Sequence, residues 1–153
     1  AHPAQVQAVV DSTDLTGSVL RATPQSGACR PFAVYGGSVC PQVPAGCAAC
    51  DHVYEQNLPT PFWGSSYYSV PWEDTYAYTY RLLAHQDNTV ITVDNDPPIT
   101  LNAGQRLEVN GTDVPHCFSG SHPFSVAQFM QGSDCSGQSD PAMLETTVVY
   151  LLA

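Results

Sequence analysis

Six cysteines are the residues of this 153-residue chain best suited to covalent or metal chemistry. Cys47-Ala-Ala-Cys50 has the spacing of a zinc ligand pair, and His52 follows it. A second close pair of ligands is missing, which favours disulfides over metal. An even number of cysteines outside a reducing compartment is typical of a disulfide framework. We therefore expect no metal site and three disulfides, formed by Cys29, Cys40, Cys47, Cys50, Cys117 and Cys135.

The pairing of these cysteines is a hypothesis, because six cysteines permit many connectivities. We expect Cys117–Cys135 to clamp the two ends of a strand. The other two expected pairs, Cys40–Cys50 and Cys29–Cys47, would pin an upstream loop region that is rich in glycine and proline.

Histidines and carboxylates form no recognised catalytic motif, since Gly-x-Ser-x-Gly, His-Glu-x-x-His and Walker sequences are all absent. His116 or His122 with Asp134 or Asp140 could build a metal site or a hydrolase centre, but packing or surface roles are favoured. Asp94-Asn95-Asp96 has alternating oxygen ligands that suit calcium, without the remaining positions of an EF-hand. A turn is the favoured interpretation, and calcium binding stays open. We predict a non-enzymatic chain without catalytic residues or cofactors.

A row of aromatic residues offers a different chemistry, because exposed rings can stack on sugar faces. The candidates for glycan stacking are Trp63, Tyr67, Trp72 and Tyr76. The favoured alternative is that Trp63, Tyr78 and Tyr80 fill the core of the sandwich while tyrosine hydroxyls reach a polar rim. Asn110-Gly111-Thr112 is a possible glycosylation sequon on a predicted hairpin tip.

The elements that position these residues are predicted to be β-strands. Tyr78 to Ala84 alternates with period two, and Thr89 to Val93 is β-branched, as expected for strands on a pleated surface. The pair Asn110-Gly111 predicts a hairpin because both residues tolerate positive φ. Further strands are predicted at 6–10, 32–35, 99–101, 105–109, 124–130 and 143–153, with a Ser/Gly turn between Phe118 and Phe124.

Composition excludes several classes of partner. Fourteen acidic residues face four basic ones, giving a net charge of −10. Such a charge argues against nucleic acid and anionic membrane surfaces, which need lysine and arginine. No run of about eighteen apolar residues is present, so membrane insertion is not expected. The first residue is alanine and no signal segment precedes it, so we expect a mature secreted, extracellular product.

Several separate motifs occur in a characteristic order: CDHVYEQNLPTPFWGSSYYSVP, then AHQDNTVITV, then ITLNAGQRLEV. In this order they resemble the N-terminal domain family of IgG-Fc-binding protein, over about residues 35–145. Asn57 interrupts the Gln-Leu-Pro-Pro that is usual in that family, and the N-terminal stretch lies outside the resemblance. The resemblance implies a secreted β-rich module of matrix, mucus or surface proteins, and it brings no enzymatic residues. Fc binding itself is not transferred from the family's name.

Together these observations predict an all-β fold, an antiparallel β-sandwich (Greek-key or jelly-roll-like) stapled by disulfides. We expect one domain over 1–153, with 1–23 a possible N-terminal strand or arm. The predicted function is that of a secreted, non-enzymatic structural or interaction module. We expect it to self-assemble into an extracellular fibre or surface layer by β-strand addition, giving a homo-oligomer or polymer. The alternative is a carbohydrate- or mucus-binding adhesin domain whose partners are glycans. The residues of the predicted assembly strands are Val6, Ala8, Val10, Val148, Tyr150 and Leu152.

Overall fold

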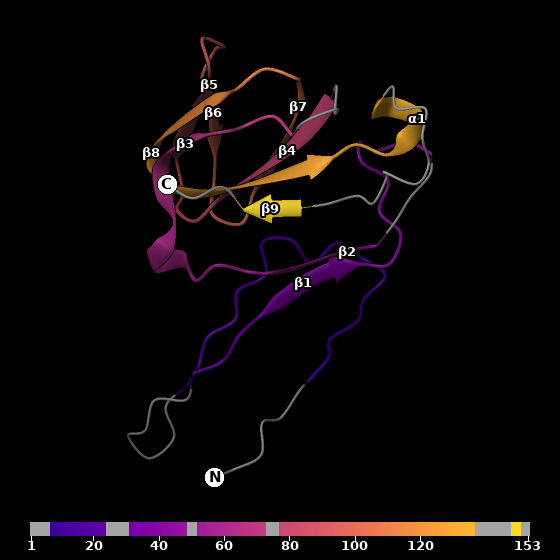
Figure 1. Ribbon diagram of the computed structural model, residues 1–153. Coiled ribbons are helices and arrows are strands. Elements are labelled where there is room, and N and C mark those ends of the chain that lie inside the picture. The colour runs from indigo at the N-terminus through magenta and orange to yellow at the C-terminus, as the bar shows by residue number, and fades with distance from the viewer. Residues whose placement is uncertain (1–6, 24–30, 49–51, 73–76, 137–147, 151–153) are drawn as a thin grey trace.

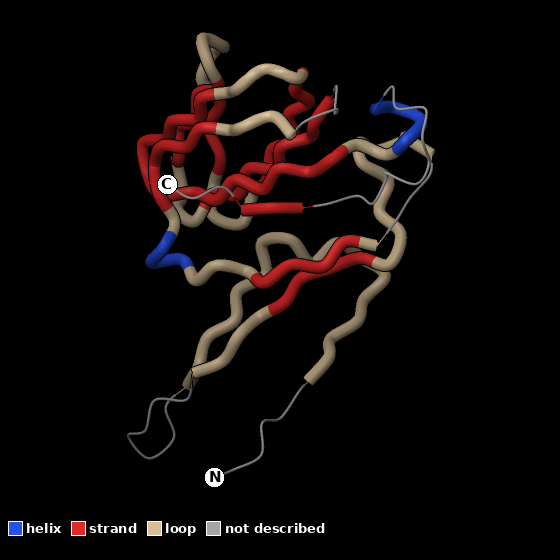
Figure 2. The backbone as a smooth tube through the Cα atoms, in the orientation of Figure 1, coloured by secondary structure: helices blue, strands red, loops and turns tan. Residues whose placement is uncertain are grey.

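The computed structural model describes residues 7–23, 31–48, 52–72, 77–136 and 148–150. These residues form two antiparallel sheets, one of two strands and one of seven (Figures 1 and 2). The smaller sheet consists of β1 (Tyr35–Ser38) and β2 (Val53–Gln56). The larger sheet consists of β3 (Gly64–Tyr68), β4 (Ala77–Ala84), β5 (Thr89–Val93), β6 (Ile99–Leu101), β7 (Arg106–Thr112), β8 (Cys117–Met130) and β9 (Val148–Tyr150). Two short helices, η1 (Thr60–Phe62) and α1 (Ser133–Ser136), complete the described part.

Strand β8 organises the larger sheet, because four other strands pair with it. Phe124 lies opposite both Gly64 of β3 and Ala84 of β4, so these two strands occupy opposite edges of β8. Ser119 likewise lies between β3 and β5. Strands β4 and β5 therefore share one edge of β8, and β3 and β9 share the other. Since β4 carries β7 and β5 carries β6, the sheet curls into a sandwich-like half-barrel.

The core fills the inside of this curl. Tyr78, Tyr80 and Leu82 of β4 are fully buried, while the side chain of Arg81 lies on the outer face beside Glu108. The period-two prediction for this strand is confirmed. Facing residues of β5 and β8 complete the core, and the principal ones are Ile91, Val93, Phe118, Phe124 and Val126. The predicted fold class, an all-β antiparallel sandwich, is also confirmed.

The predicted turn between Phe118 and Phe124 is wrong, because β8 continues through this segment as a 14-residue strand. Its small polar residues have ladder partners on both edges, as the position of Ser119 between Ser66 and Thr92 shows. Gly120 also makes room for the core, since a Cβ there would lie 2.7 Å from the ring of Phe124. Glycine and serine here allow close packing inside a sheet. The same residue types also favour turns, so the local sequence does not distinguish the two structures.

The predicted hairpin at Asn110-Gly111 is also wrong. Both residues lie within β7, where Asn110 pairs with Thr79 and Gly111 pairs with Tyr78. A Cβ on Gly111 would lie 2.6 Å from Tyr80 and 2.8 Å from His116, so glycine is required there for packing. The possible sequon at Asn110 therefore lies on a strand, where Asn110 Oδ1 accepts a 2.9 Å hydrogen bond from Thr79.

The β1–β2 hairpin is fastened to the outside of the larger sheet. Val43 and Val53 pack against Ala127 and Phe129 of β8. The N–H of Gly132 donates to the carbonyl of Val43 at 2.8 Å. A disulfide between Cys47 and Cys135, 88 residues apart in the sequence, closes the same junction.

This disulfide corrects the expected connectivity. Cys117–Cys135 and Cys29–Cys47 are wrong, because Cys47 pairs with Cys135 and Cys117 is a free thiol. Cys117 is the first residue of β8 and Cys135 follows its other end, and a 14-residue strand is about 45 Å long, far more than a disulfide spans. Three internal disulfides are therefore excluded. Cys40 is also disulfide-bonded, and Cys29 and Cys50 lie outside the described residues.

The two predicted assembly segments differ. Strand β9, which includes Val148 and Tyr150, pairs with β8 of its own chain, whereas Leu152 lies outside the described residues. Residues 7–10, with Ala8 and Val10, are exposed and belong to no strand, so the strand predicted there is wrong over the described part; Val6 lies outside it. The following residues are held against the sheet, because Asp14 pairs with Arg106 and Gly17 lies against Gly104.

Removing the Cys47–Cys135 disulfide in a Cys47→Ala/Cys135→Ala variant should lower the free energy of unfolding by about 2–5 kcal/mol, as loss of a native disulfide usually does. The physical reason is that the unfolded chain is then free of a long covalent loop. Urea unfolding followed by tyrosine and tryptophan fluorescence measures the difference. Cys117→Ala is the matched control and should leave the midpoint within about 0.5 kcal/mol of wild type. Equal midpoints for the double variant and wild type would contradict the assigned pairing.

Candidate functional site

The described residues of the aromatic row predicted to stack on glycans make structural contacts. Tyr67 is 2% exposed; its hydroxyl accepts from the N–H of Gly64 and donates to the carbonyl of Phe124, and burial raises its pKa. Trp72 packs edge-on against Tyr78, whose hydroxyl donates to the carbonyl of Trp72. Tyr67 is therefore buried and not available for glycan stacking, whereas the core interpretation holds for Tyr78 and Tyr80, which are fully buried.

Trp63 also has structural contacts, although it is only half-buried. Its Nε1–H donates to the carbonyl of Leu58 at 3.0 Å, and its ring lies edge-on to His85. Tyr76, the fourth residue of the row, lies outside the described residues. The three described members thus each make contacts that support the fold.

His116 belongs to a polar cluster that joins the ends of three strands. Its Nδ1 lies 2.7 Å from Oδ2 of Asp94, and its backbone N–H donates to Oγ of Ser69, which also accepts from Tyr80. Oδ1 of Asp94 accepts the N–H of Cys117, and Asp94 returns its own N–H to the carbonyl of Cys117. The hydrogen bond from Cys117, followed by that from His116, holds the pKa of Asp94 below its ordinary value. The cluster fastens β5 and the segment after β3 to the start of β8.

The contacts of His116, Asp94 and Asp96 bear on the metal and catalytic hypotheses for these residues. His116 contacts Asp94 rather than Asp134, and Asp140 lies outside the described residues. Asp94 and Asp96 belong to a turn in which the N–H of Asp96 donates to the carbonyl of Val93, as the favoured interpretation predicted. Across the described ranges, no group of three or more histidine, cysteine, aspartate or glutamate residues is arranged to hold a metal ion.

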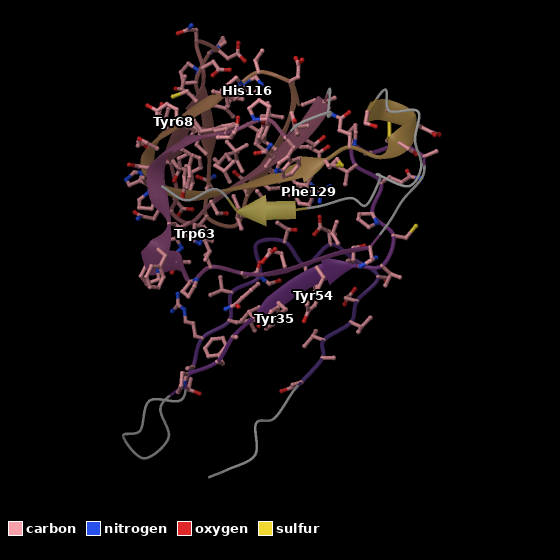
Figure 3. All side chains as sticks on the ribbon, in the orientation of Figure 1. Tyr35, Tyr54, Trp63, Tyr68, His116 and Phe129 are labelled. Carbon is pink, nitrogen blue, oxygen red and sulfur yellow. A yellow bond between two sulfur atoms is a disulfide. The ribbon has the colours of Figure 1, made fainter. Side chains whose placement is uncertain are left out.

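The outer face of the β1–β2 hairpin presents a pair of tyrosines. Tyr35 lies opposite Gln56 and Gly37 lies opposite Tyr54, so these four residues share one side of the ribbon. We call them the tyrosine face. The rings of Tyr35 and Tyr54 are stacked, with centroids 5.3 Å apart and planes within 5° of parallel. Figure 3 shows both side chains on the side of the hairpin away from the larger sheet.

Each side of the hairpin has its own role. Val53 and Glu55 alternate with the tyrosine face and point toward the larger sheet, where Val53 joins the apolar cluster of β8. Tyr35 and Tyr54 stay 52% and 66% exposed. Gly37 permits the stacking, since a Cβ there would lie 3.2 Å from the ring of Tyr54 and 2.6 Å from the carbonyl of Val53.

Sequence reasoning missed the tyrosine face because its residues come from two segments that only strand pairing brings together. The available signal was weak: Tyr35-Gly36-Gly37 and the alternation through Val53-Tyr54-Glu55. Large exposed hydrophobic side chains are frequent in the described part of residues 7–62, namely Val9, Val10, Leu15, Val19, Leu20, Phe32, Tyr35, Val39, Tyr54 and Phe62.

A family model described as IgGFc binding protein matches residues 2–151. The chain belongs to the IgGFc binding protein family. The match covers nearly the whole chain, so it includes the N-terminal stretch that the motifs left outside the resemblance. The IgGFc binding family comprises extracellular binding modules, which agrees with the class expected from the motifs. No curated protein and no solved structure matches the sequence. Among the described residues, none of the helices has the length and apolar character needed to cross a membrane.

Replacing Asp94 with alanine should destabilise the protein at neutral pH by about 1 kcal/mol, the usual net value of a lost hydrogen bond at a partly exposed site. Because the folded-state pKa of Asp94 lies below the ordinary value of 3.8, its contribution is present at neutral pH. The contribution disappears as pH falls through the folded-state pKa.

The measurement is urea unfolding of wild type and Asp94→Ala at pH 7 and at successively lower pH, with the difference expected to shrink below about pH 4. Asp96→Ala is the control, because Asp96 contributes its backbone N–H to the turn. A difference between Asp94→Ala and wild type that does not change with pH would contradict the assigned role of the carboxylate.

Proposed function

We propose that this chain is a non-enzymatic extracellular interaction module that binds protein or glycoprotein partners through the tyrosine face. The observation that carries the proposal is the exposed, stacked pair of Tyr35 and Tyr54. Tyrosine is enriched at binding sites because it brings a large, rigid contact area with a polar tip. Membership of the IgGFc binding family supports a binding role.

The hairpin is held ready for binding by its attachment to the larger sheet. The Val43–Phe129 packing and the Cys47–Cys135 disulfide fix the ribbon in place, and the stacked rings restrict each other's rotation. A surface that is rigid before binding loses less conformational entropy when a partner docks. The net charge of −10 makes polyanionic partners such as nucleic acid unfavourable.

The structural roles of the reactive side chains support the non-enzymatic part of the proposal. The carboxylate of Asp94 is bonded to one backbone group, the N–H of Cys117, and to one side chain, the imidazole of His116. The Nε2 atom of His116 is buried between the core and β7. The Nδ1 atom of His116 contacts Asp94 and its Nε2 atom has no hydrogen-bond partner, so the imidazole makes no hydrogen bond to the neighbouring thiol of Cys117. The two groups therefore do not form a nucleophile and base within hydrogen-bond reach.

Tyr54→Ala should weaken binding to an extracellular glycoprotein partner at least about tenfold, as removal of an exposed aromatic anchor typically does. Because the family description names IgG Fc, glycosylated Fc is the first probe, followed by a panel of purified secreted glycoproteins. Surface plasmon resonance on immobilised probes measures the affinity. Tyr68→Ala is the matched control, since Tyr68 is 71% exposed on a different strand, β3. Wild-type affinity in Tyr54→Ala and Tyr35→Ala would remove the tyrosine face from the proposal.

Self-assembly into a fibre or surface layer is the second candidate function. The observation that favours it is the segment 7–10, in which Val9 and Val10 are 72% and 91% exposed and pair with no strand of the described part. An extended apolar segment of this kind can add to the sheet edge of a neighbouring copy. Such a head-to-tail contact need not close into a ring, and it then produces a filament. Strand β9 is a weaker donor, because it already pairs with β8.

Deleting residues 1–12 should abolish any polymers formed by the full chain. The reason is that the deletion removes the donor segment and keeps Asp14, which pairs with Arg106 and holds the following residues on the sheet. Negative-stain electron microscopy and size-exclusion chromatography of both forms make the comparison. Polymers that survive truncation would shift the donor role to the C-terminal strand. A stable monomer in both forms would remove self-assembly altogether.

A further inference from the structure

We propose that the ligand group bound by the tyrosine face is an uncharged sugar ring, presented by a glycan of the partner. This inference rests on the proposed function and specifies the chemistry that the same surface recognises. Its residues, Tyr35, Gly37, Tyr54 and Gln56, differ from the aromatic row that the sequence suggested for glycan stacking.

The arrangement of the two rings favours a sugar. Carbon atoms in contact are about 3.5–4.0 Å apart, whereas the two ring centroids are 5.3 Å apart with nearly parallel planes. The stack is therefore offset, and each ring keeps part of its face uncovered, in agreement with the half-exposed side chains. The electron-rich face of a phenol ring attracts the weakly positive C–H groups on the apolar side of a pyranose.

The polar groups of the tyrosine face suit hydroxyl groups. Two phenolic hydroxyls can both donate and accept, and the amide of Gln56 provides two donors and an acceptor. These are the complements that sugar hydroxyls require. The residues of the face carry no charge, because the neighbouring carboxylate, Glu55, alternates to the opposite side of the strand. Its Oε1 accepts the backbone N–H of Gln56.

The charge of the chain selects among sugars. A net charge of −10 repels sialylated and sulfated glycans, and no basic residue of the tyrosine face offsets this repulsion. Neutral residues such as galactose, mannose, glucose or N-acetylglucosamine meet no such penalty. The class of ligand is therefore a neutral pyranose.

The size of the tyrosine face also distinguishes a sugar from a protein surface. Two paired strands of four residues cover about 13 Å by 5 Å. A stable protein–protein contact buries about 800 Å² on each partner, so a protein partner would also have to contact surface well beyond these four residues. One or two sugar rings match its dimensions, and weak single-ring contacts gain strength when a glycoprotein presents several glycans.

Titration of lactose, mannobiose, cellobiose and N,N′-diacetylchitobiose into the isotope-labelled full chain tests the inference by nuclear magnetic resonance. We expect at least one of them to shift resonances of residues 35–38 and 53–56 selectively, with sialyllactose at least several-fold weaker than lactose. Tyr54→Ala and Tyr35→Ala should abolish the shifts, Tyr54→Phe should keep most of them, and Tyr68→Ala should change nothing. Unchanged thermal midpoints and near-ultraviolet circular dichroism show that the variants remain folded.

Two outcomes would overturn the inference and leave the proposed function in place. In the first, none of the neutral sugars shifts the tyrosine face, while glycoprotein binding depends on Tyr54 and survives enzymatic removal of the glycans. In the second, sialyllactose binds as tightly as lactose, which removes the preference for uncharged sugars. A third outcome is that both tyrosine variants bind glycoproteins as tightly as wild type and that none of the sugar titrations shifts resonances of the tyrosine face. This outcome would reject the inference and the role of this face in the proposed function.

Discussion

The pairing of β8 with four strands is the constraint on which the rest of the structure depends. Strand β8 carries β4 and β5 on successive lengths of one edge and β3 and β9 on the other, and the sheet curls around it. The curl that results turns the inner faces of β4, β5 and β8 toward one another, and their aromatic side chains fill the space between them. The requirement for close approach to the core explains why Gly111 of β7 and Gly120 of β8 occupy positions where a Cβ would collide with core rings.

The opposite face of β8 determines where the candidate site lies. Ala127 and Phe129 offer an apolar strip on the outside of the sheet, and the β1–β2 hairpin covers it through Val43 and Val53. A two-stranded ribbon is only marginally stable by itself, so this packing and the Cys47–Cys135 disulfide give it a fixed place. Because one side of the ribbon is used for attachment, the alternation of side chains leaves the tyrosine pair on the other side.

Polar side chains that suggested chemistry mostly serve the architecture. Asp94, His116 and Ser69 satisfy backbone groups at a junction of three strand ends, where water would otherwise compete. Tyr67 uses its hydroxyl for the same purpose within the core. Histidine, aspartate and tyrosine thus appear in a binding module without implying an active site, since buried backbone groups require partners of the same chemical types.

The sequence by itself determined the fold class, most of the strands and the family, because alternation and β-branched composition are local properties and the family motifs lie in linear order. It predicted β4 and β5 closely, since Tyr78 to Ala84 and Thr89 to Val93 carry a clear pattern over their whole length. The tertiary structure alone decided the disulfide connectivity, the continuity of β8 through Gly120 and the strand position of Asn110-Gly111. It also assembled the tyrosine face, because Tyr35 and Tyr54 become neighbours only through strand register. Those outcomes depend on which distant residues pack together, and a local pattern does not contain that information.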